Sequence, residues 1–134
     1  MSSSNLGLSE PILKSLSHKG YKEPTPIQEK SIPAILEGSD IMAAAQTGTG
    51  KTASFTLPIL HNLSHPKNNH KVHQVRALIR TPTRELAAQV RDNIVTYGKN
   101  TDLRSTAVYG GARIHNQQLK LKKGVDILVA TPGR

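Results

Sequence analysis

The stretch of sequence that decides the fold class is IMAAAQTGTGKT, at residues 41–52. Its first five residues form a short apolar run bounded by Asp40 and a glycine-rich turn, and this pattern predicts a buried strand of a parallel sheet from Ile41 to Ala45. A helix is expected to follow from Lys51 to about Leu63. The segment therefore predicts a strand, a turn and a helix, in that order.

The turn at residues 45–52 fits a phosphate-binding loop, except that Ala45 stands where the strict pattern has glycine. Glycines let backbone N–H groups surround phosphate oxygens, and the start of the following helix adds partial positive charge. Lys51 is expected to reach the β- and γ-phosphates, and the Thr52 hydroxyl to ligate Mg²⁺. The alternative is a glycine-rich turn that binds nothing. The residues expected to contact the nucleotide here are Gln46, Thr47, Gly48, Thr49, Gly50, Lys51 and Thr52.

The expected nucleotide carries adenine. The sequence has no Asn-Lys-x-Asp segment, which would read guanine, so a GTPase fits poorly. We therefore expect ATP or ADP, together with Mg²⁺, as the cofactor.

Apolar runs and helical segments alternate along the rest of the chain. Ser9 is expected to cap a helix that ends at His18, and residues 64–74 read as a surface loop. Strands joined by helical segments of this length indicate right-handed crossovers and an α/β fold with a mainly parallel sheet flanked by helices. Further helices are expected at residues 26–36, 83–98 and 113–123, and further strands at residues 77–81, 105–109 and 126–130.

The chain is strongly basic, with 18 Lys and Arg residues against 9 Asp and Glu and a formal net charge of +9. Such a field attracts polyanions, of which nucleic acid is the commonest, although a basic surface that only serves solubility is the alternative. Lys120, Lys122 and Lys123 are interpreted as a solvated helix end, with RNA contact as the alternative.

Length and composition exclude several classes of protein. The 134 residues suffice for one domain, and the lack of cysteine excludes a disulfide framework, thiolate catalysis and a zinc ribbon while fitting a cytoplasmic location. No signal peptide is expected at residues 1–5, and no apolar run is long enough for a bilayer, so no membrane role is expected. Without a nearby carboxylate cluster, the following histidines are interpreted as solvated side chains and not as metal ligands: His61, His65, His70 and His73.

Four further segments resemble motifs of one family. Residues 20–28, GYKEPTPIQ, resemble the Q motif of the DEAD-box RNA helicases. Residues 82–87 resemble motif Ia, Gly110-Gly111 resembles the GG motif, and residues 131–134 resemble motif Ib. Together with the phosphate-binding loop they stand in the family order, and the resemblance runs from about Leu6 to the last residue.

The resemblance implies an incomplete RecA-like P-loop NTPase domain at residues 6–134, preceded by a flexible tail at residues 1–5. It implies that Gln28 pairs with the adenine edge through N6 and N7, and that Tyr21 and Thr25 belong to the same site. The three later motifs each follow a predicted strand, and in this family they contact the sugar-phosphate backbone of single-stranded RNA without reading sequence. The residues so assigned to RNA are Pro82, Thr83, Arg84, Gly110, Gly111, Thr131, Pro132, Gly133 and Arg134.

The sequence also departs from the family pattern. Residues 1–20 hold no Phe, Tyr or Trp, and Ser3 stands near the place of the ring that stacks on adenine. The Asp-Glu-Ala-Asp segment, the Ser-Ala-Thr motif and the second RecA-like domain are absent, and no Asp or Glu closes a predicted strand. We therefore expect no catalytic residue and no useful ATP turnover by this chain alone. Because the missing strands of a RecA-like fold lie within its sheet, exposed sheet edges and self-association are expected.

Three functions are compatible with these residues. The leading hypothesis is the ATP-binding and RNA-backbone-binding segment of an ATP-dependent RNA helicase, which unwinds or remodels RNA by coupling to ATP hydrolysis. The second is a non-catalytic basic module that binds RNA without nucleotide. The third is an unrelated P-loop ATPase, in which Gln28 has no influence on base preference.

Overall fold

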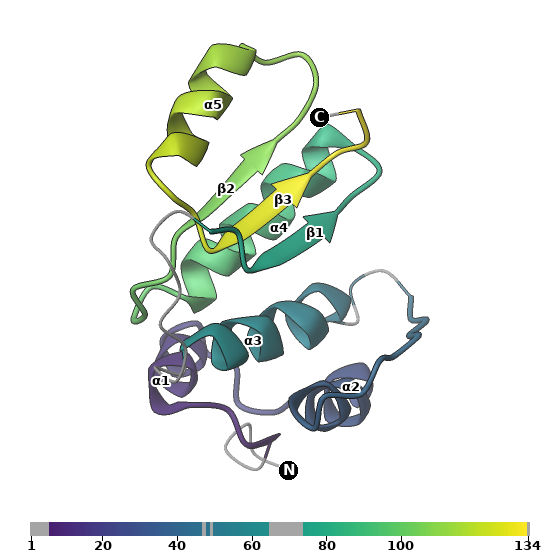
Figure 1. Ribbon diagram of the computed structural model, residues 1–134. Coiled ribbons are helices and arrows are strands. Elements are labelled where there is room, and N and C mark those ends of the chain that lie inside the picture. The colour runs from purple at the N-terminus through teal and green to yellow at the C-terminus, as the bar shows by residue number, and fades with distance from the viewer. Residues whose placement is uncertain (1–5, 47, 49, 65–73, 134) are drawn as a thin grey trace.

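The computed structural model describes residues 6–46, 48, 50–64 and 74–133 (Figure 1). Outside residues 41–45, helices and strands form close to their predicted bounds, and the predicted tail at residues 1–5 lies outside the described residues. The helices are α1 (Glu10–His18), α2 (Pro26–Leu36), α3 (Lys51–Ser64), α4 (Arg84–Tyr97) and α5 (Ile114–Lys122), and the strands are β1 (Ala77–Arg80), β2 (Ser105–Val108) and β3 (Ile127–Ala130).

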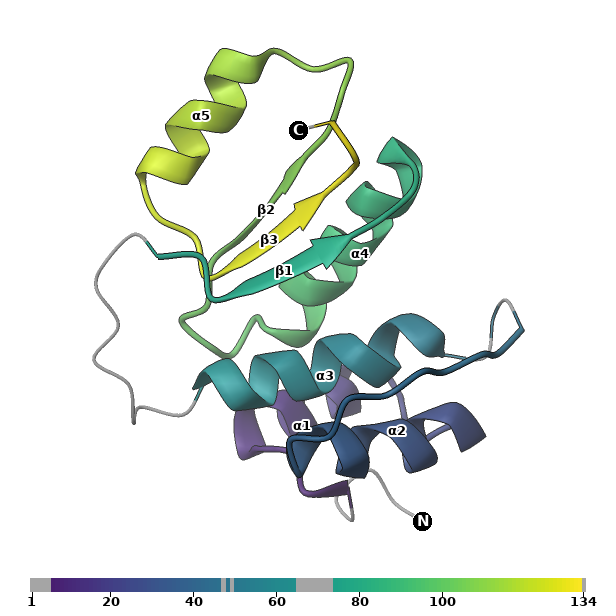
Figure 2. The same cartoon turned by 45° about the vertical axis from the view of Figure 1, so that its right-hand side comes forward.

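The three strands form a parallel sheet in the order β1-β3-β2. In the register, Ile79 and Ala107 flank Val129 on the central strand. Helix α4 connects β1 to β2 and covers one face of the sheet, whereas α5 connects β2 to β3 and lies beyond β2 on the other side (Figures 1 and 2). The predicted α/β class, with a mainly parallel sheet flanked by helices, is confirmed.

The hydrophobic core lies between the sheet, α4 and the first three helices. Helix α3 packs against α2 and α4, and α1 contacts both α3 and α4. Burial of a large apolar side chain contributes about 1.5–3 kcal/mol, so this core is what holds the three N-terminal helices to the sheet. The apolar side chains with no exposed surface are Ile12, Ile32, Leu60, Ala87, Ile127 and Val129.

Helix starts follow the sequence signals, with one unexpected contact. The Thr83 hydroxyl caps α4 by accepting a hydrogen bond from the Leu86 backbone N at 3.2 Å. Ser9 precedes α1, but its side chain makes no capping bond. Its backbone N donates instead to His61 Nδ1 on α3, at 3.0 Å. The interpretation of His61 as a solvated side chain is therefore wrong, because the fold brings the start of α1 to its ring. His65, His70 and His73 lie outside the described residues.

Asp126 joins the starts of all three strands. Its Oδ2 accepts a hydrogen bond from the Arg104 backbone N at 2.9 Å, and its Oδ1 lies 3.5 Å from Arg76 Nη1. Its carbonyl accepts bonds from the backbone N atoms of Arg76 and Ala77. Arg104 immediately precedes β2 and Arg76 immediately precedes β1, so one acidic residue before β3 aligns both neighbouring strands.

Residues 41–45 contradict their prediction, because the structure gives them no regular secondary structure. Ile41 is 42% exposed and Met42 is fully exposed, so the segment is neither a strand nor buried. A strand needs a hydrogen-bonded neighbour, and among the described residues the sheet ends at β1 without reaching this segment. The apolar pattern is that of a strand, but the missing neighbour overrides it.

The strand β1 is also less buried than predicted. Ile79 is buried, whereas Leu78 is 59% exposed and Arg80 points to solvent. The reason is its place in the sheet, since β1 is an edge strand of the described residues and one of its faces is left uncovered.

Candidate functional site

Gln28 is the third residue of α2 and joins that helix to the phosphate-binding loop. Its Oε1 accepts a hydrogen bond from the Thr25 backbone N at 3.1 Å, and its Nε2 donates to the Gly50 carbonyl at 3.2 Å. The side chain is only 7% exposed. The bond to Thr25 N fixes the start of α2, as in a capping box. The family resemblance assigns this amide to adenine. In the structure, its oxygen and its nitrogen each already make a hydrogen bond to the backbone of this chain.

The close approach of Gln28 requires glycine at position 50. Gly50 has a φ of 82°, and a Cβ built there would lie 2.3 Å from Gln28 Nε2 and 3.0 Å from Thr25 Oγ1. Any side chain at this position would displace the glutamine. Thr25 Oγ1 faces the helix start as in a capping box, yet it is buried and makes no hydrogen bond of acceptable geometry with the described residues.

The space beside Gly48 is empty, whereas that beside Gly50 is filled by Gln28 and Thr25. It also has a φ of 82°, but a Cβ built there would meet no atom within 4 Å. A left-handed backbone beside empty space, three residues before α3 begins, is the arrangement that lets an anion approach backbone N–H groups.

The start of α3 places the two side chains expected at the phosphates. Lys51 is the first residue of α3 and is exposed, and Thr52 follows it half-buried. A helix N-terminus favours negative charge, so this exposed ammonium and the helix dipole act on the same region. Gln46 lies in the irregular segment before the loop, while Thr47 and Thr49 lie outside the described residues.

Tyr21 lies at the edge of this region, against α4. Its ring meets that of Tyr97 edge to face, with 6.2 Å between the centroids. Burial, followed by the hydrogen bond and the charge of Tyr21, raises the pKa of Tyr97 well above its usual range. Tyr21 itself remains 48% exposed, so one face of its ring stays accessible beside the Q-motif segment.

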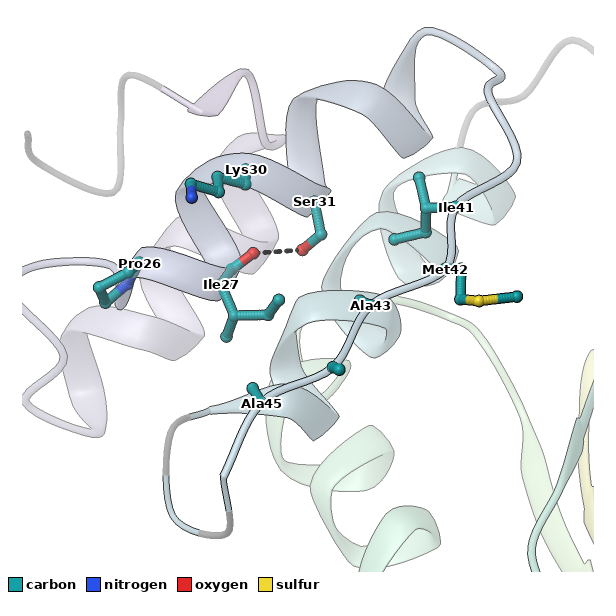
Figure 3. Close-up of a pocket in the computed structure, with 9 residues that line it drawn as sticks. Pro26, Ile27, Lys30, Ser31, Ile41, Met42, Ala43 and Ala45 are labelled. Carbon is teal, nitrogen blue, oxygen red and sulfur yellow. Dashed lines mark hydrogen bonds between the residues drawn. The ribbon is translucent and has the colours of Figure 1, made fainter.

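A hollow with a volume of about 500 Å³ lies between α2 and residues 41–45. Figure 3 shows that Ile27 and Ile41 both turn into it, while the Ser31 hydroxyl is engaged with the Ile27 carbonyl at 2.7 Å. Its walls are mostly apolar, and it opens where residues 41–45 stand away from a sheet. We therefore do not assign it to the nucleotide.

The three segments assigned to RNA lie together at the carboxyl end of the sheet. Residues 82–84 follow β1, residues 110–111 follow β2 and residues 131–133 follow β3, and the three strands run in the same direction (Figure 1). Arg84 reaches across to the segment after β2, because a Cβ built on Gly111 would lie 2.8 Å from Arg84 Nη1.

Backbone and capping bonds hold these three segments in place. The Thr131 backbone N donates to the Val108 carbonyl at 3.1 Å, and Gln117 Nε2 donates to the Tyr109 carbonyl at 3.0 Å. The Thr83 hydroxyl is occupied as the cap of α4. The fold thus brings Pro82, Thr83, Arg84, Gly110, Gly111, Thr131, Pro132 and Gly133 to one edge, and Arg134 lies outside the described residues.

Comparison with known proteins identifies the family. Residues 25–134 match the family model described as DEAD/DEAH box helicase. The chain belongs to this family. It is 52% identical over 130 residues to the DEAD-box ATP-dependent RNA helicase RhpA of Helicobacter pylori, covering 97% of this chain and 25% of that protein. It is 48% identical over 134 residues to the ATP-dependent RNA helicase CshA of Limosilactobacillus reuteri, covering all of this chain and 26% of that protein.

A solved structure of the family supports the RecA-like fold. The crystal structure of a DEAD box protein from the hyperthermophile Methanococcus jannaschii matches with a TM-score of 0.88 and 43% identity, and the match covers 100% of this chain and 35% of that one. The DEAD-box chain described here spans about a quarter of the length of the helicases RhpA and CshA. The predicted family and fold class are both confirmed.

Two absences hold for the described part of the DEAD-box chain, residues 6–46, 48, 50–64 and 74–133. No described helix combines the length and the apolar composition needed to cross a membrane. Within the same ranges, no three His, Cys, Asp or Glu side chains lie close enough together to hold a metal ion.

Sequence reasoning found the motifs of this DEAD-box chain but missed their internal contacts. Nothing local indicates that Gln28 reaches Gly50, which is 22 residues away, or that Arg84 lies on Gly111. The basic side chains Arg91 and Arg104 stand in no motif, and they meet only because α4 packs on β2.

Replacing Gln28 tests the link between α2 and the loop. Gln28→Ala is expected to lower the free energy of unfolding by about 1–3 kcal/mol, because the Thr25 N–H and the Gly50 carbonyl both lose their partner in a partly buried site. Urea unfolding measures this change. Gln118→Ala removes the same atoms from an exposed position on α5 and is expected to change stability by less than about 0.5 kcal/mol. Equal losses in the two variants would contradict the role given to Gln28.

Proposed function

We propose that residues 6–134 are the N-terminal portion of the first RecA-like domain of an ATP-dependent RNA helicase, and that they bind ATP or ADP and the RNA backbone. The observation that carries this proposal is the bond from Gln28 Nε2 to the Gly50 carbonyl, which joins the Q-motif segment to the phosphate-binding loop. In the complete protein these groups serve a helicase that couples RNA remodelling to ATP hydrolysis. The cysteine-free composition supports a cytoplasmic location, which imaging of a fluorescent fusion tests.

The residues present fit a nucleoside phosphate. Gly48 offers open space beside a left-handed backbone, and Lys51 stands exposed at the first turn of α3. The buried Thr25 Oγ1 lies beside the loop, 3.0 Å from a Cβ built on Gly50, and faces the Gln28 backbone N in the capping box. Tyr21 and Gln28 lie at the other end of the same region, where an adenine would rest. Backbone N–H groups and Lys51 would hold the phosphates, with Gln28 and Tyr21 at the base.

We propose that the Thr52 hydroxyl ligates the Mg²⁺ ion that accompanies the nucleotide. A half-buried hydroxyl at the second position of α3 is the place from which a threonine ligates the ion bound to the phosphates. The ion would neutralise phosphate charge, while Thr52 and Lys51 orient the phosphates on the helix start. We assign no catalytic residue within the described ranges, because no Asp or Glu there follows the carboxyl end of a strand.

Titration calorimetry with Mg-ADP and Mg-GDP tests the nucleotide site. We expect ADP to bind more tightly than GDP, and Lys51→Ala to weaken ADP binding at least about tenfold, which corresponds to ~1.4 kcal/mol. Gln28→Ala is expected to reduce the preference for ADP over GDP, whereas Lys14→Ala on α1 and Gln118→Ala serve as matched controls without effect. An unchanged base preference in a folded Gln28→Ala chain would favour an unrelated P-loop ATPase. No nucleotide binding at all would favour a basic RNA-binding module.

The carboxyl edge of the sheet is proposed as the RNA-backbone site. Support comes from the convergence of two glycine-containing segments with the start of α4. Further support comes from Arg84, whose exposed guanidinium lies over Gly111. Glycine backbones and helix starts donate to phosphate oxygens, and such contacts carry no base sequence.

Fluorescence polarisation with a labelled single-stranded RNA tests this edge. Arg84→Ala is expected to weaken binding roughly three- to tenfold and to lower the slope of log affinity against log salt by about 0.7, the value for one lost phosphate contact. Lys14→Ala removes the same charge from α1 and is expected to leave both values unchanged. Equal effects of the two variants would mean that only net charge matters, and the assignment of Arg84 would fail.

We also infer that the chain self-associates through its uncovered apolar surface. Met42 is fully exposed and Leu78 on β1 is 59% exposed, beside a strand edge with free backbone groups. Such edges pair readily with another copy. Met42→Lys with Leu78→Lys is expected to weaken association more than tenfold, because each apolar side chain contributes about 1.5–3 kcal/mol on burial.

Light scattering after gel filtration measures the self-association over a range of concentrations. Leu119→Lys on α5, where the leucine is 45% exposed, introduces the same kind of change elsewhere and is the control. A chain that stays monomeric at every concentration would refute the inference.

A further inference from the structure

A groove lies at the amino end of β2, beside α4 and, in part, α5. Two adjoining hollows of about 340 and 370 Å³ share the side chains of Arg91, Arg104 and Ser105. We call their union the β2-edge groove. Figure 1 shows α4 and α5 on either side of β2, and both helices contact this strand.

The charged residues that line the β2-edge groove are all basic. No Asp or Glu lines either hollow, and no aromatic residue does, within the described part of the chain. The neighbouring carboxylate, that of Asp126, is directed to the backbone N of Arg104 and to Arg76. The cationic residues that line the groove are Arg91, Lys99, Arg104, Lys120 and Lys123.

Arg91 carries an unused donor in this groove. Its Nε is buried, and no described residue accepts its hydrogen bond. A buried donor without an acceptor costs about 1–3 kcal/mol, so an oxygen atom supplied from outside the chain would remove that cost. Arg104 is already fixed beside it, since its Nη1 donates to the Lys123 carbonyl at 3.2 Å and its backbone N to Asp126. The groove therefore presents hydrogen-bond donors of Arg91 and Arg104, and no carboxylate lines it.

The β2-edge groove lies at the opposite end of β2 from the carboxyl edge of the sheet, and α4 passes both places. Arg84 and Arg91 are seven residues apart on α4, which is about two turns and about 10.5 Å along the same side of the helix. Arg84 lies at Gly111, just past the carboxyl end of β2, and Arg91 lies at Ser105, where β2 begins. A strand of nucleic acid covers this distance with about three phosphates at ~3.4 Å per residue.

We propose that the β2-edge groove binds the phosphodiester backbone of RNA that extends beyond the carboxyl edge of the sheet. This inference rests on the proposed function for the identity of the polyanion. Guanidinium and ammonium groups supply charge and donors to phosphate oxygens, and the lack of aromatic side chains means that bases are neither stacked nor read there. The groove adds affinity for longer RNA without adding sequence preference.

The same cations have another possible use, which the experiment separates. Charged side chains along an edge strand keep it from pairing with other sheets. That role needs exposed charge alone, and it makes no use of a hollow or of the buried Arg91 Nε. If it is the whole explanation, removing the lysines promotes association between copies and leaves RNA affinity unchanged.

The test compares a single-stranded RNA of about 6 nucleotides with one of about 20, lengths on either side of a typical single-strand binding site. Lys120→Ala with Lys123→Ala is expected to weaken binding of the longer RNA by about tenfold and to lower its salt slope by about 1.4, the value for two phosphate contacts. Binding of the shorter RNA is expected to change by less than about twofold. Arg91→Lys keeps the charge but removes the Nε donor, and is expected to weaken only the longer RNA.

Lys14→Ala with Lys19→Ala is the matched control, because it removes two exposed charges at α1. An equal loss with this pair, equal losses for the two RNA lengths, or a rise in association without a change in RNA binding would each overturn the proposal. The two proposals fail separately. Arg84→Ala could leave the affinity for the shorter RNA unchanged while the lysine pair lowers the affinity for the longer one. That result would refute the carboxyl-edge site and support the groove.

Discussion

The side-chain amide of Gln28 is the interaction on which the arrangement of the nucleotide region depends. It holds the start of α2 through Thr25 N and the entry to α3 through the Gly50 carbonyl. Because α2 and α3 pack along one another, these two bonds set where the phosphate-binding loop stands relative to the Q-motif segment. Glycine at position 50 is a consequence, since any side chain there would collide with the amide. A ligand that engages this amide would also act on the carbonyl at the end of the loop, because the same side chain serves both.

The second constraint is that a strand exists only beside another strand. Residues 77–80, 105–108 and 127–130 pair with one another, and Asp126 aligns their starts. Residues 41–45 have a comparable apolar pattern but no neighbour within the described residues, and they remain irregular and exposed. The phosphate-binding loop consequently starts from an unpaired segment instead of a strand end. Its position is then maintained from the helix side, through Gln28 and the packing of α3.

Arginine side chains gather at two places on the sheet, one at each end of β2. Arg84 stands at the carboxyl end of the sheet, where two glycine-containing segments meet the start of α4. Arg91 and Arg104 stand at the other end of β2. Helix α4 carries one arginine to each place, because Arg84 is its first residue and Arg91 lies about two turns further along. The positions of these basic residues on the surface thus cannot be read from the composition alone. A polyanion bound at one end of β2 lies close to further donors along its edge.

The sequence by itself determined the family, the alternation of strands and helices, and the motif residues. These features depend on local periodicity, on proline and capping residues at helix starts such as Pro26 and Thr83, and on short glycine-rich patterns, all of which are written within a few residues. Only the tertiary structure decided that residues 41–45 are not a strand, that His61 accepts a bond from Ser9, that Gln28 is turned to Gly50, and that Arg91 meets Arg104. Each of these depends on which segments become neighbours in space, and pairing, burial and free hydrogen-bond donors are properties of neighbours rather than of local sequence.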